Sequence, residues 1–182
     1  MTKIHFGLFM GILLVGIITS HLSFFTASAN AHRIDSEIEV SLSQQNAIST
    51  KFPTSIQRWK TLIEATAKKY NLDPNLIASI MMVESAGNPQ AISSNGAVGL
   101  LQVMPRDGIA ASFLCMNKPC FYNRPTKKEL LEPEFNLDYG IGLLIDLLNQ
   151  YGNLRDALLH YGPINVEFTY ADRILTFYEQ YQ

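Results

Sequence analysis

Glu84 is the residue of this chain whose surroundings best suit acid–base chemistry. Apolar side chains precede it by three, four and seven residues and so share its side of a predicted helix: Met81, Ile80 and Ile77. Burial among them and the negative end of the helix dipole both raise a carboxyl pKa. A raised pKa suits a general acid that works near neutral pH. A surface glutamate at a frayed helix end is the alternative, and the residues after Glu84 decide between them.

Capping residues set the limits of this helix. Asp73 can cap its N-terminus, and Pro74 suits its first turn. Neither glycine nor proline interrupts the run up to Ser85, and Gly87 with Pro89 is expected to end it. Glu84 is therefore predicted to lie in the last turn.

The residues that follow Glu84 match a known family at fixed spacing. The matching positions are Glu84-Ser85, Gly87, Pro89, Ala91, Ser93, Gly96-Ala97, Gly99-Leu100, Gln102 and Met104-Pro105. This segment resembles the catalytic region of soluble lytic transglycosylases, bacterial enzymes with a lysozyme-like fold that cut peptidoglycan. A phosphate-binding loop is the rival interpretation, but no Lys-Ser or Lys-Thr pair follows the glycines and no strand is expected before them.

The resemblance implies roles for this segment. Glu84 would be the catalytic acid and Ser85 would orient it, with helix capping as the alternative for Ser85. The glycine-rich loop would line a glycan groove, where Gly99 lets the backbone approach the ligand closely. Gln102 and Met104 would contact sugar or its N-acetyl group, although core packing explains Met104 equally well.

Two tyrosines near the C-terminus extend the resemblance. Tyr161 fits the tyrosine of a family motif usually written Ala-Tyr-Asn-x-Gly, although His160 replaces its alanine and Gly162 stands where its asparagine would be. Tyr170 resembles the family tyrosine that hydrogen-bonds the catalytic acid, with a core aromatic as the alternative. For His160, a packed or solvated histidine is favoured over a second titrating group.

The chemistry implied is cleavage with one carboxylate. Ordinary glycosidases use two carboxylates, but no Asp or Glu lies between Ser85 and Arg106. As the resemblance implies, Glu84 would act as acid and then base, and the product would carry a 1,6-anhydromuramyl end. No cofactor is expected, and the four histidines form no His-Glu-x-x-His metal motif. A hydrolytic muramidase and a non-catalytic wall-binding scaffold are the alternatives.

A signal peptide is predicted over residues 1–29. A lysine gives a positive start, an apolar core runs from Phe6 to Ile18, and Ala27-Ser28-Ala29 fits the cleavage pattern. Cleavage after Ala31 is an alternative, and so is an uncleaved anchor, because hydrophobicity continues to Phe25. The mature protein is expected to be periplasmic or secreted, touching a membrane only through this segment.

The rest of the chain is predicted to be an arm followed by one domain. Residues 30–54 are rich in Ser, Gln, Asn and Ala and suggest a flexible arm or linker, and residues 55–182 suggest a single domain. The formal net charge of −2 and the lack of a basic run argue against nucleic-acid binding. Small size and simplicity suggest, as a hypothesis, local opening of the wall for a secretion or conjugation apparatus.

The two cysteines, Cys115 and Cys120, are predicted to form a disulfide, because they lie in a proline-containing segment of an exported chain. The short loop between them implies a small entropic contribution to stability. This segment departs from the simplest family pattern. Local stabilisation is the favoured role, and a rim that adjusts substrate access is the alternative.

Apolar spacing and turn residues predict about five main helices. The first carries Ile56, Trp59, Ile63, Ala67 and Tyr70 and ends at Asn71. After the Glu84 helix, one is expected from a cap at Asn136 to Gly152, one from Asn153 to Gly162-Pro163, and one from near Asn165 to Tyr181. With no convincing strand pair, the fold class is mainly α. Together with the resemblance, this predicts a lysozyme-like single domain with a glycan-binding groove.

Overall fold

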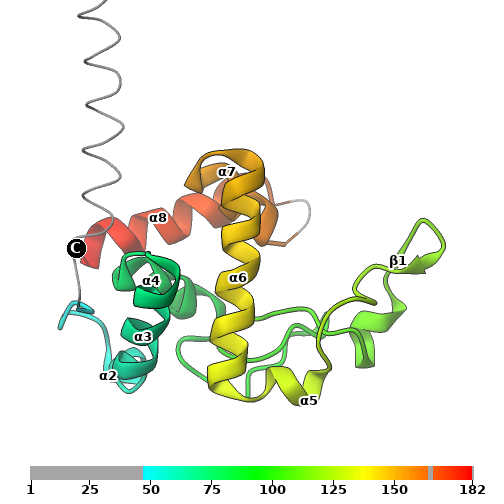
Figure 1. Cartoon of the computed structure of the whole chain (residues 1–182), viewed down its shortest axis with the longest axis horizontal. Coiled ribbons are helices and arrows are strands. Elements are labelled where there is room, and N and C mark those ends of the chain that lie inside the picture. The colour runs from blue at the N-terminus through cyan, green and yellow to red at the C-terminus, as the bar shows by residue number, and fades with distance from the viewer. Residues whose placement is uncertain (1–46, 164–165, 182) are drawn as a thin grey trace, which may run out of the picture. The chain divides into compact units, whose positions relative to one another are not determined.

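Helix α4 (Pro74–Ser85), the Glu84 helix, lies at the centre of the computed structural model, which describes residues 47–163 and 166–181. Its first eight residues are all buried, from Pro74 to Met81. It packs against α3 (Lys60–Tyr70) and α8 (Thr169–Tyr181), as Figure 1 shows. The Glu84 helix is thus held from two sides.

The remaining elements complete a mainly α fold. They are α2 (Thr54–Gln57), the 3₁₀ turn η1 (Gly108–Ser112), β1 (Leu114–Cys115), β2 (Lys118–Pro119), α5 (Lys127–Leu130), α6 (Pro133–Tyr151) and α7 (Leu154–Tyr161). Of the seven α-helices in the described residues, α2 and α5 have only four residues each. The other five correspond to the five main helices that the sequence predicts, except that the first of these is broken: Ile56 lies in α2, and Trp59 takes the capping position of α3. Ser43–Gln182 forms a compact unit that holds every buried side chain described here.

The predicted helix boundaries are confirmed where capping residues define them. The Asp73 side chain accepts a hydrogen bond from the Asn75 amide, with Oδ1 2.8 Å from that nitrogen. Asn71 ends α3 in the left-handed conformation, and Gly152 ends α6 in the same way. Asn153 then caps α7 by accepting from the Asp156 amide over 2.9 Å.

Two further helices begin elsewhere than predicted. Asn136 does not cap α6, which starts three residues earlier at Pro133, because proline suits the first turn and Glu132 takes the capping position. Helix α8 begins at Thr169 rather than near Asn165, and Asn165 itself lies outside the described residues.

The end of the predicted flexible arm packs on the domain. Ile48 and Phe52 are each only 3% exposed. The Ile48 amide donates to Glu64 over 3.0 Å, and the Ser49 amide donates to Asn75 Oδ1 over 2.7 Å. Apolar burial and these hydrogen bonds order the segment from Ile48 onward, so the flexible arm predicted for residues 30–54 does not include residues 48–54. The predicted signal peptide lies outside the described residues.

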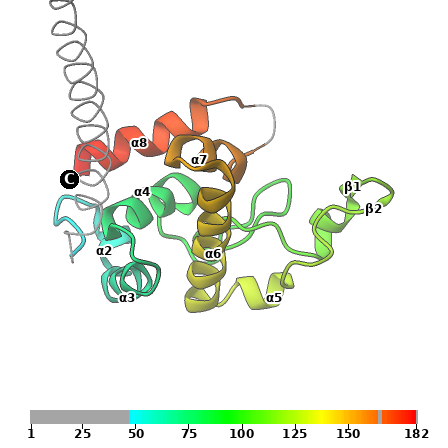
Figure 2. The same ribbon diagram turned by 45° about the horizontal axis from the view of Figure 1, so that its top comes forward.

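The cysteine segment forms a small hairpin. β1 and β2 pair antiparallel, although no strand pair is predicted from the sequence, and the predicted Cys115–Cys120 disulfide joins them. Figure 2 shows this hairpin projecting beyond α5.

A membrane span requires a helix of sufficient length and hydropathy. Among residues 47–163 and 166–181, no helix meets both requirements.

Asn136 anchors the loop of residues 86–105 to α6. Its side chain is fully buried and accepts from the Leu101 amide over 2.8 Å. It also donates to two backbone oxygens, those of Val98 and Leu130, each over 2.9 Å. One amide therefore satisfies three backbone groups that are otherwise cut off from water.

Asn136→Leu is expected to lower the free energy of unfolding by at least about 3 kcal/mol, because it leaves three buried polar groups without partners. Urea unfolding followed by circular dichroism measures this loss. Asn149→Leu is the matched control, since Asn149 lies exposed on the same helix. Equal effects of the two substitutions would contradict the anchoring role of Asn136.

Candidate active site

Glu84 meets a tyrosine hydroxyl at the end of α4. The Tyr170 hydroxyl, in the first turn of α8, donates a hydrogen bond to Glu84 Oε1. Both side chains are half-buried, so the carboxyl group is withdrawn from water without being sealed off. The structure thus brings together two residues that are 86 positions apart in the chain, as the sequence predicts for Tyr170.

The surroundings of Glu84 suit a group that gains and loses a proton near neutrality. Burial raises the pKa of Glu84 from its ordinary 4.5 to about 7, and the hydrogen bond from Tyr170 opposes that rise. Ile77, Ile80 and Met81, on the predicted apolar stripe, are all fully buried. The helical spacing found in the sequence therefore accounts for the burial that raises this pKa.

Tyr161 forms a second side of the site. Its hydroxyl donates to the Leu101 carbonyl over 3.1 Å. Burial raises the pKa of Tyr161, and the negative charge of Glu84 adds to that rise. Burial, followed by the charge of Glu84, also raises the pKa of Tyr170. Both phenols therefore stay protonated and act as hydrogen-bond donors.

Ser85 ties the following loop to the helix. Its hydroxyl donates to the Leu100 carbonyl over 2.8 Å and accepts from the Gly87 amide over 3.2 Å. It also donates to the Met81 carbonyl of α4 over 3.4 Å, so its partners are backbone groups of both the helix and the loop. Ser85 thus holds the backbone next to Glu84. This role is similar to helix capping, the alternative stated for Ser85 in the sequence analysis.

The side chain of Gln102 is used within the loop. Its Nε2 donates to the Ala91 carbonyl over 3.1 Å and to the Gly99 carbonyl over 2.9 Å. Its own backbone has a φ of 46°, an uncommon conformation for a residue other than glycine. The amide nitrogen of Gln102 therefore holds the loop in shape, and the sugar contact that the resemblance implies for this residue stays a prediction.

Gly99 is required by contacts within the chain. Its φ is 79°, and a Cβ there would lie 2.3 Å from Asn136 Nδ2 and 2.6 Å from the Leu130 carbonyl oxygen. The loop thus approaches α6 closely at Gly99, and the approach to a ligand expected there stays a prediction. Met104 is half-buried, which fits either of its two predicted roles.

One residue near the site has another role than the predicted one, and a second is not singled out by the sequence. Asn136 is predicted to cap a helix, although its position three residues after Pro133 fits the Pro-x-x-Asn pattern common in the resembled family. Arg124 is half-buried, lies over the Phe121 ring at 4.8 Å from its centroid, and interacts electrostatically with Tyr161. Only the folded chain reveals this proximity, because Arg124 and Tyr161 are 37 positions apart in the chain.

His160 lies apart from this chemistry. It is exposed and stacks on Tyr151, with ring centroids 3.9 Å apart. This is the packed, solvated histidine that the sequence favours.

Within the described part of the chain, no cluster of three His, Cys, Asp or Glu side chains is arranged to hold a metal ion.

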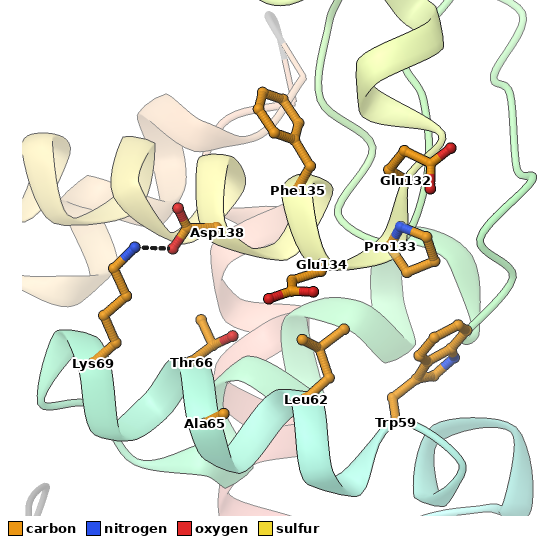
Figure 3. A pocket seen from close by; sticks show the side chains of 10 residues that line it. All are labelled: Trp59, Leu62, Ala65, Thr66, Lys69, Glu132, Pro133, Glu134, Phe135 and Asp138. Atoms are coloured by element: carbon orange, nitrogen blue, oxygen red, sulfur yellow. Dashed lines mark hydrogen bonds and ion pairs between the residues drawn. The ribbon is translucent and has the colours of Figure 1, made fainter.

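An open depression of about 790 Å³ lies between α3 and the start of α6 (Figure 3). Trp59, Leu62 and Phe135 line it together with polar residues, and the ion pair of Lys69 with Asp138 crosses one end. Glu84 does not line it. Its connection to the site is indirect: the Trp59 indole donates to the Gly87 carbonyl over 2.9 Å, three residues after Glu84.

Glu84→Gln is expected to stabilise the protein at alkaline pH. Because the folded pKa of Glu84 is about 7 and its ordinary value is 4.5, the folded chain keeps a proton that the unfolded chain loses between these values. The free energy of unfolding therefore falls as the pH rises through that window, and ionised Glu84 costs up to about 3 kcal/mol above it. The neutral amide of glutamine avoids this cost.

Urea unfolding of the wild type and Glu84→Gln at pH 5 and pH 8 tests this expectation. The gain from the substitution should be clearly larger at pH 8. Glu179→Gln, which changes an exposed glutamate of α8, is the control and should show no such dependence. A gain of equal size at both pH values would mean that Glu84 titrates like a solvated carboxyl.

Comparison with known proteins places the chain in a family. Residues 61–170 match the family model described as Transglycosylase SLT domain. The chain is 34% identical to membrane-bound lytic murein transglycosylase E of Buchnera aphidicola over 56% of this chain and 45% of that protein. It is 37% identical to a transglycosylase of Enterobacteria phage PRD1, over 59% of this chain and 35% of that one. These matches thus span less than half of each relative.

A solved structure supports the fold. The lytic transglycosylase Slt of Pseudomonas aeruginosa, solved as an inactive mutant, aligns with a TM-score of 0.53 and 20% identity, over 72% of this chain and 24% of that one. This similarity confirms the predicted lysozyme-like, mainly α architecture. Since the family model covers more than half of its residues, the chain belongs to the transglycosylase SLT domain family.

Proposed function

We propose that this protein is a peptidoglycan lytic transglycosylase in which Glu84 is the single catalytic carboxyl group. The observation that carries the proposal is the half-buried Glu84, whose pKa is raised to about 7 and whose Oε1 accepts a hydrogen bond from Tyr170. A group with this pKa is present in both protonation states near neutral pH, as acid and base roles in one cycle require. Family membership supplies the substrate class.

The first step uses protonated Glu84 as a general acid. Glu84 donates its proton to the glycosidic oxygen between N-acetylmuramic acid and N-acetylglucosamine, and the bond from that oxygen to the muramyl C1 breaks. The electron pair leaves with the oxygen, which becomes a hydroxyl of the departing sugar. The substrate's own N-acetyl oxygen stabilises the cationic C1, so the protein needs no nucleophile of its own.

The second step uses ionised Glu84 as a general base. The carboxylate takes the proton of the muramyl 6-hydroxyl, whose oxygen forms a bond to C1 and closes the 1,6-anhydro ring. Glu84 is then protonated again, and no water is consumed. Tyr170 donates to the carboxylate between these steps and stabilises its charge, since a hydrogen bond to the ionised form lowers a carboxyl pKa.

The surroundings of Glu84 favour this reaction over hydrolysis by paired carboxylates. Burial and the Tyr170 hydrogen bond are the causes of its altered pKa, and neither involves a second carboxylate. A retaining enzyme places its two carboxyl groups about 5 Å apart, a distance at which each charge raises the pKa of the other group. A hydrolytic muramidase with the same acid is the second candidate, separated from the first by its products.

We also propose that the protein works outside the cytoplasm, in the periplasm or beyond it. The Cys115–Cys120 disulfide is typical of proteins that fold in an oxidising compartment, and peptidoglycan lies in such a compartment. The predicted signal peptide of residues 1–29 would deliver the chain there. The proposed partner class is a secretion or conjugation apparatus that needs local opening of the wall.

Glu84→Gln is expected to lower the rate of release of soluble fragments from purified sacculi by about a hundredfold or more, because glutamine cannot donate the proton. Mass spectrometry of the wild-type products should show anhydromuramyl ends, which are lighter by one water than hydrolysis products. Glu179→Gln is the control and should release fragments at the wild-type rate. Wild-type products that contain the added water would establish the muramidase instead.

Tyr170→Phe is expected to move the alkaline limb of the pH–rate profile upward by about one unit. The lost hydrogen bond stabilises ionised Glu84, so its removal raises the pKa of Glu84 above 7 and extends the range in which the acid is protonated. The rate at the optimum should fall because the carboxyl group loses its orientation.

Tyr181→Phe is the matched control for this substitution, since Tyr181 lies on the same helix and stacks on Phe52. Its profile should coincide with that of the wild type. A Tyr170→Phe enzyme that is slower at every pH by the same factor would show that Tyr170 does not set the pKa of Glu84.

A further inference from the structure

The hairpin of residues 113–122, called here the disulfide finger, has a defined shape. Its strands pair Leu114 with Pro119 and Cys115 with Lys118, and the disulfide joins them. The tip consists of Met116 and Asn117, whose φ values of 48° and 65° make a tight turn. A covalent cross-link behind a two-residue turn holds this tip in a fixed, convex form.

The side chains of the disulfide finger are apolar where water reaches them most. Met116 at the tip is 97% exposed and Leu114 is 69% exposed. Phe113 and Tyr122, on either side of the strands, are 39% and 55% exposed. Figures 1 and 2 show the finger extending away from the helices. Such a gathering of exposed apolar side chains on a soluble domain marks an interaction surface.

The charge around the finger has one sign. Between Asp107 and Glu129 the chain contains no acidic residue, whereas it contains four cations: Lys118, Arg124, Lys127 and Lys128. The three lysines are exposed, and no ion pair engages any of the four within the described residues. The chain as a whole has a formal charge of −2, so this positive segment departs from the average.

We propose that the disulfide finger is a membrane-contact site, which inserts Met116 and Leu114 into the interfacial region of an anionic phospholipid bilayer. Lys118, next to the turn, then lies among the phosphate groups. Phe113 and Tyr122, nearer the base, lie at the level where aromatic side chains favour the interface. Apolar insertion combined with cations is the general basis of reversible binding to anionic membranes.

The shape of the finger favours a bilayer over a protein partner. Its tip is a single convex turn, and a protein would need a matching apolar cleft to cover a side chain that is 97% exposed. A bilayer accepts a convex apolar tip without a preformed cleft. The finger is also short, with ten residues, which is far less than the 20–30 residues that each partner typically contributes to a stable protein interface.

This inference does not depend on the catalytic role of Glu84. It concerns a separate segment, and binding can be measured without peptidoglycan. If the proposed function also holds, contact through the finger would keep the enzyme at the layer of the wall closest to the membrane.

Co-sedimentation with vesicles tests the proposal. The compact unit Ser43–Gln182, which lacks the apolar N-terminal segment, is mixed with vesicles of phosphatidylcholine alone or with added phosphatidylglycerol. It should bind the anionic vesicles and not the neutral ones. The double variant Leu114→Ser/Met116→Ser should weaken binding at least about tenfold, since two apolar side chains no longer insert. Lys118→Glu should weaken it about tenfold.

Matched controls make the same chemical changes elsewhere. Ile92→Ser removes an apolar side chain that is 47% exposed outside the finger, and Lys68→Glu reverses an exposed charge on α3. Both should bind like the wild type. Thermal unfolding of each variant confirms that it is folded. In the full chain, the double variant should lose less vesicle binding if the N-terminal segment also binds lipid.

A direct probe reports on insertion itself. Leu114→Trp should show a blue-shifted emission with anionic vesicles and quenching by brominated acyl chains, whereas the native Trp59 should show neither. Absence of quenching would overturn the proposal. So would equal binding to neutral vesicles, binding unaffected by the finger variants, or failure to bind vesicles combined with self-association that the double variant abolishes.

Discussion

The opposition between burial and hydrogen bonding at Glu84 is the constraint on which the site depends. Burial among apolar side chains favours the neutral acid, and the Tyr170 hydroxyl favours the anion. Burial alone would leave an acid reluctant to ionise, and the hydrogen bond alone would leave a carboxylate with no proton to donate. A pKa of about 7 results from both effects acting on one group.

Helix α8 keeps these effects in place because it is attached to α4 at both ends. The Tyr178 hydroxyl donates to Asp73 Oδ2 over 2.8 Å at the start of α4, and the Tyr170 hydroxyl donates to Glu84 at its end. The two helices therefore run antiparallel with a fixed register. The loop after Glu84 is held from the other side, through Ser85 on the helix and Asn136 on α6.

The sequence predicted the parts of this arrangement that depend on local chemistry. The caps at Asp73 and Asn153 and the apolar stripe before Glu84 follow from helical spacing and side-chain type, and the structure has them. It could not predict how polar side chains would be shared between distant segments. The Asn136 amide suits a helix cap equally well by its chemistry, and only the packing of the loop on α6 shows which backbone groups it satisfies.

Hydrogen bonding to backbone groups also explains the positions of the side chains in and around the loop of residues 86–105. A loop rich in glycine exposes backbone groups that need partners, and Gln102 and Asn136 supply these partners from within the chain. If the loop lines the glycan site as proposed, this fixed conformation would lower the entropy lost on binding. Since ionised Glu84 lowers the free energy of unfolding, the extensive burial of α4 must offset this cost. The rigid loop also keeps the Glu84 carboxyl group in the buried surroundings that raise its pKa.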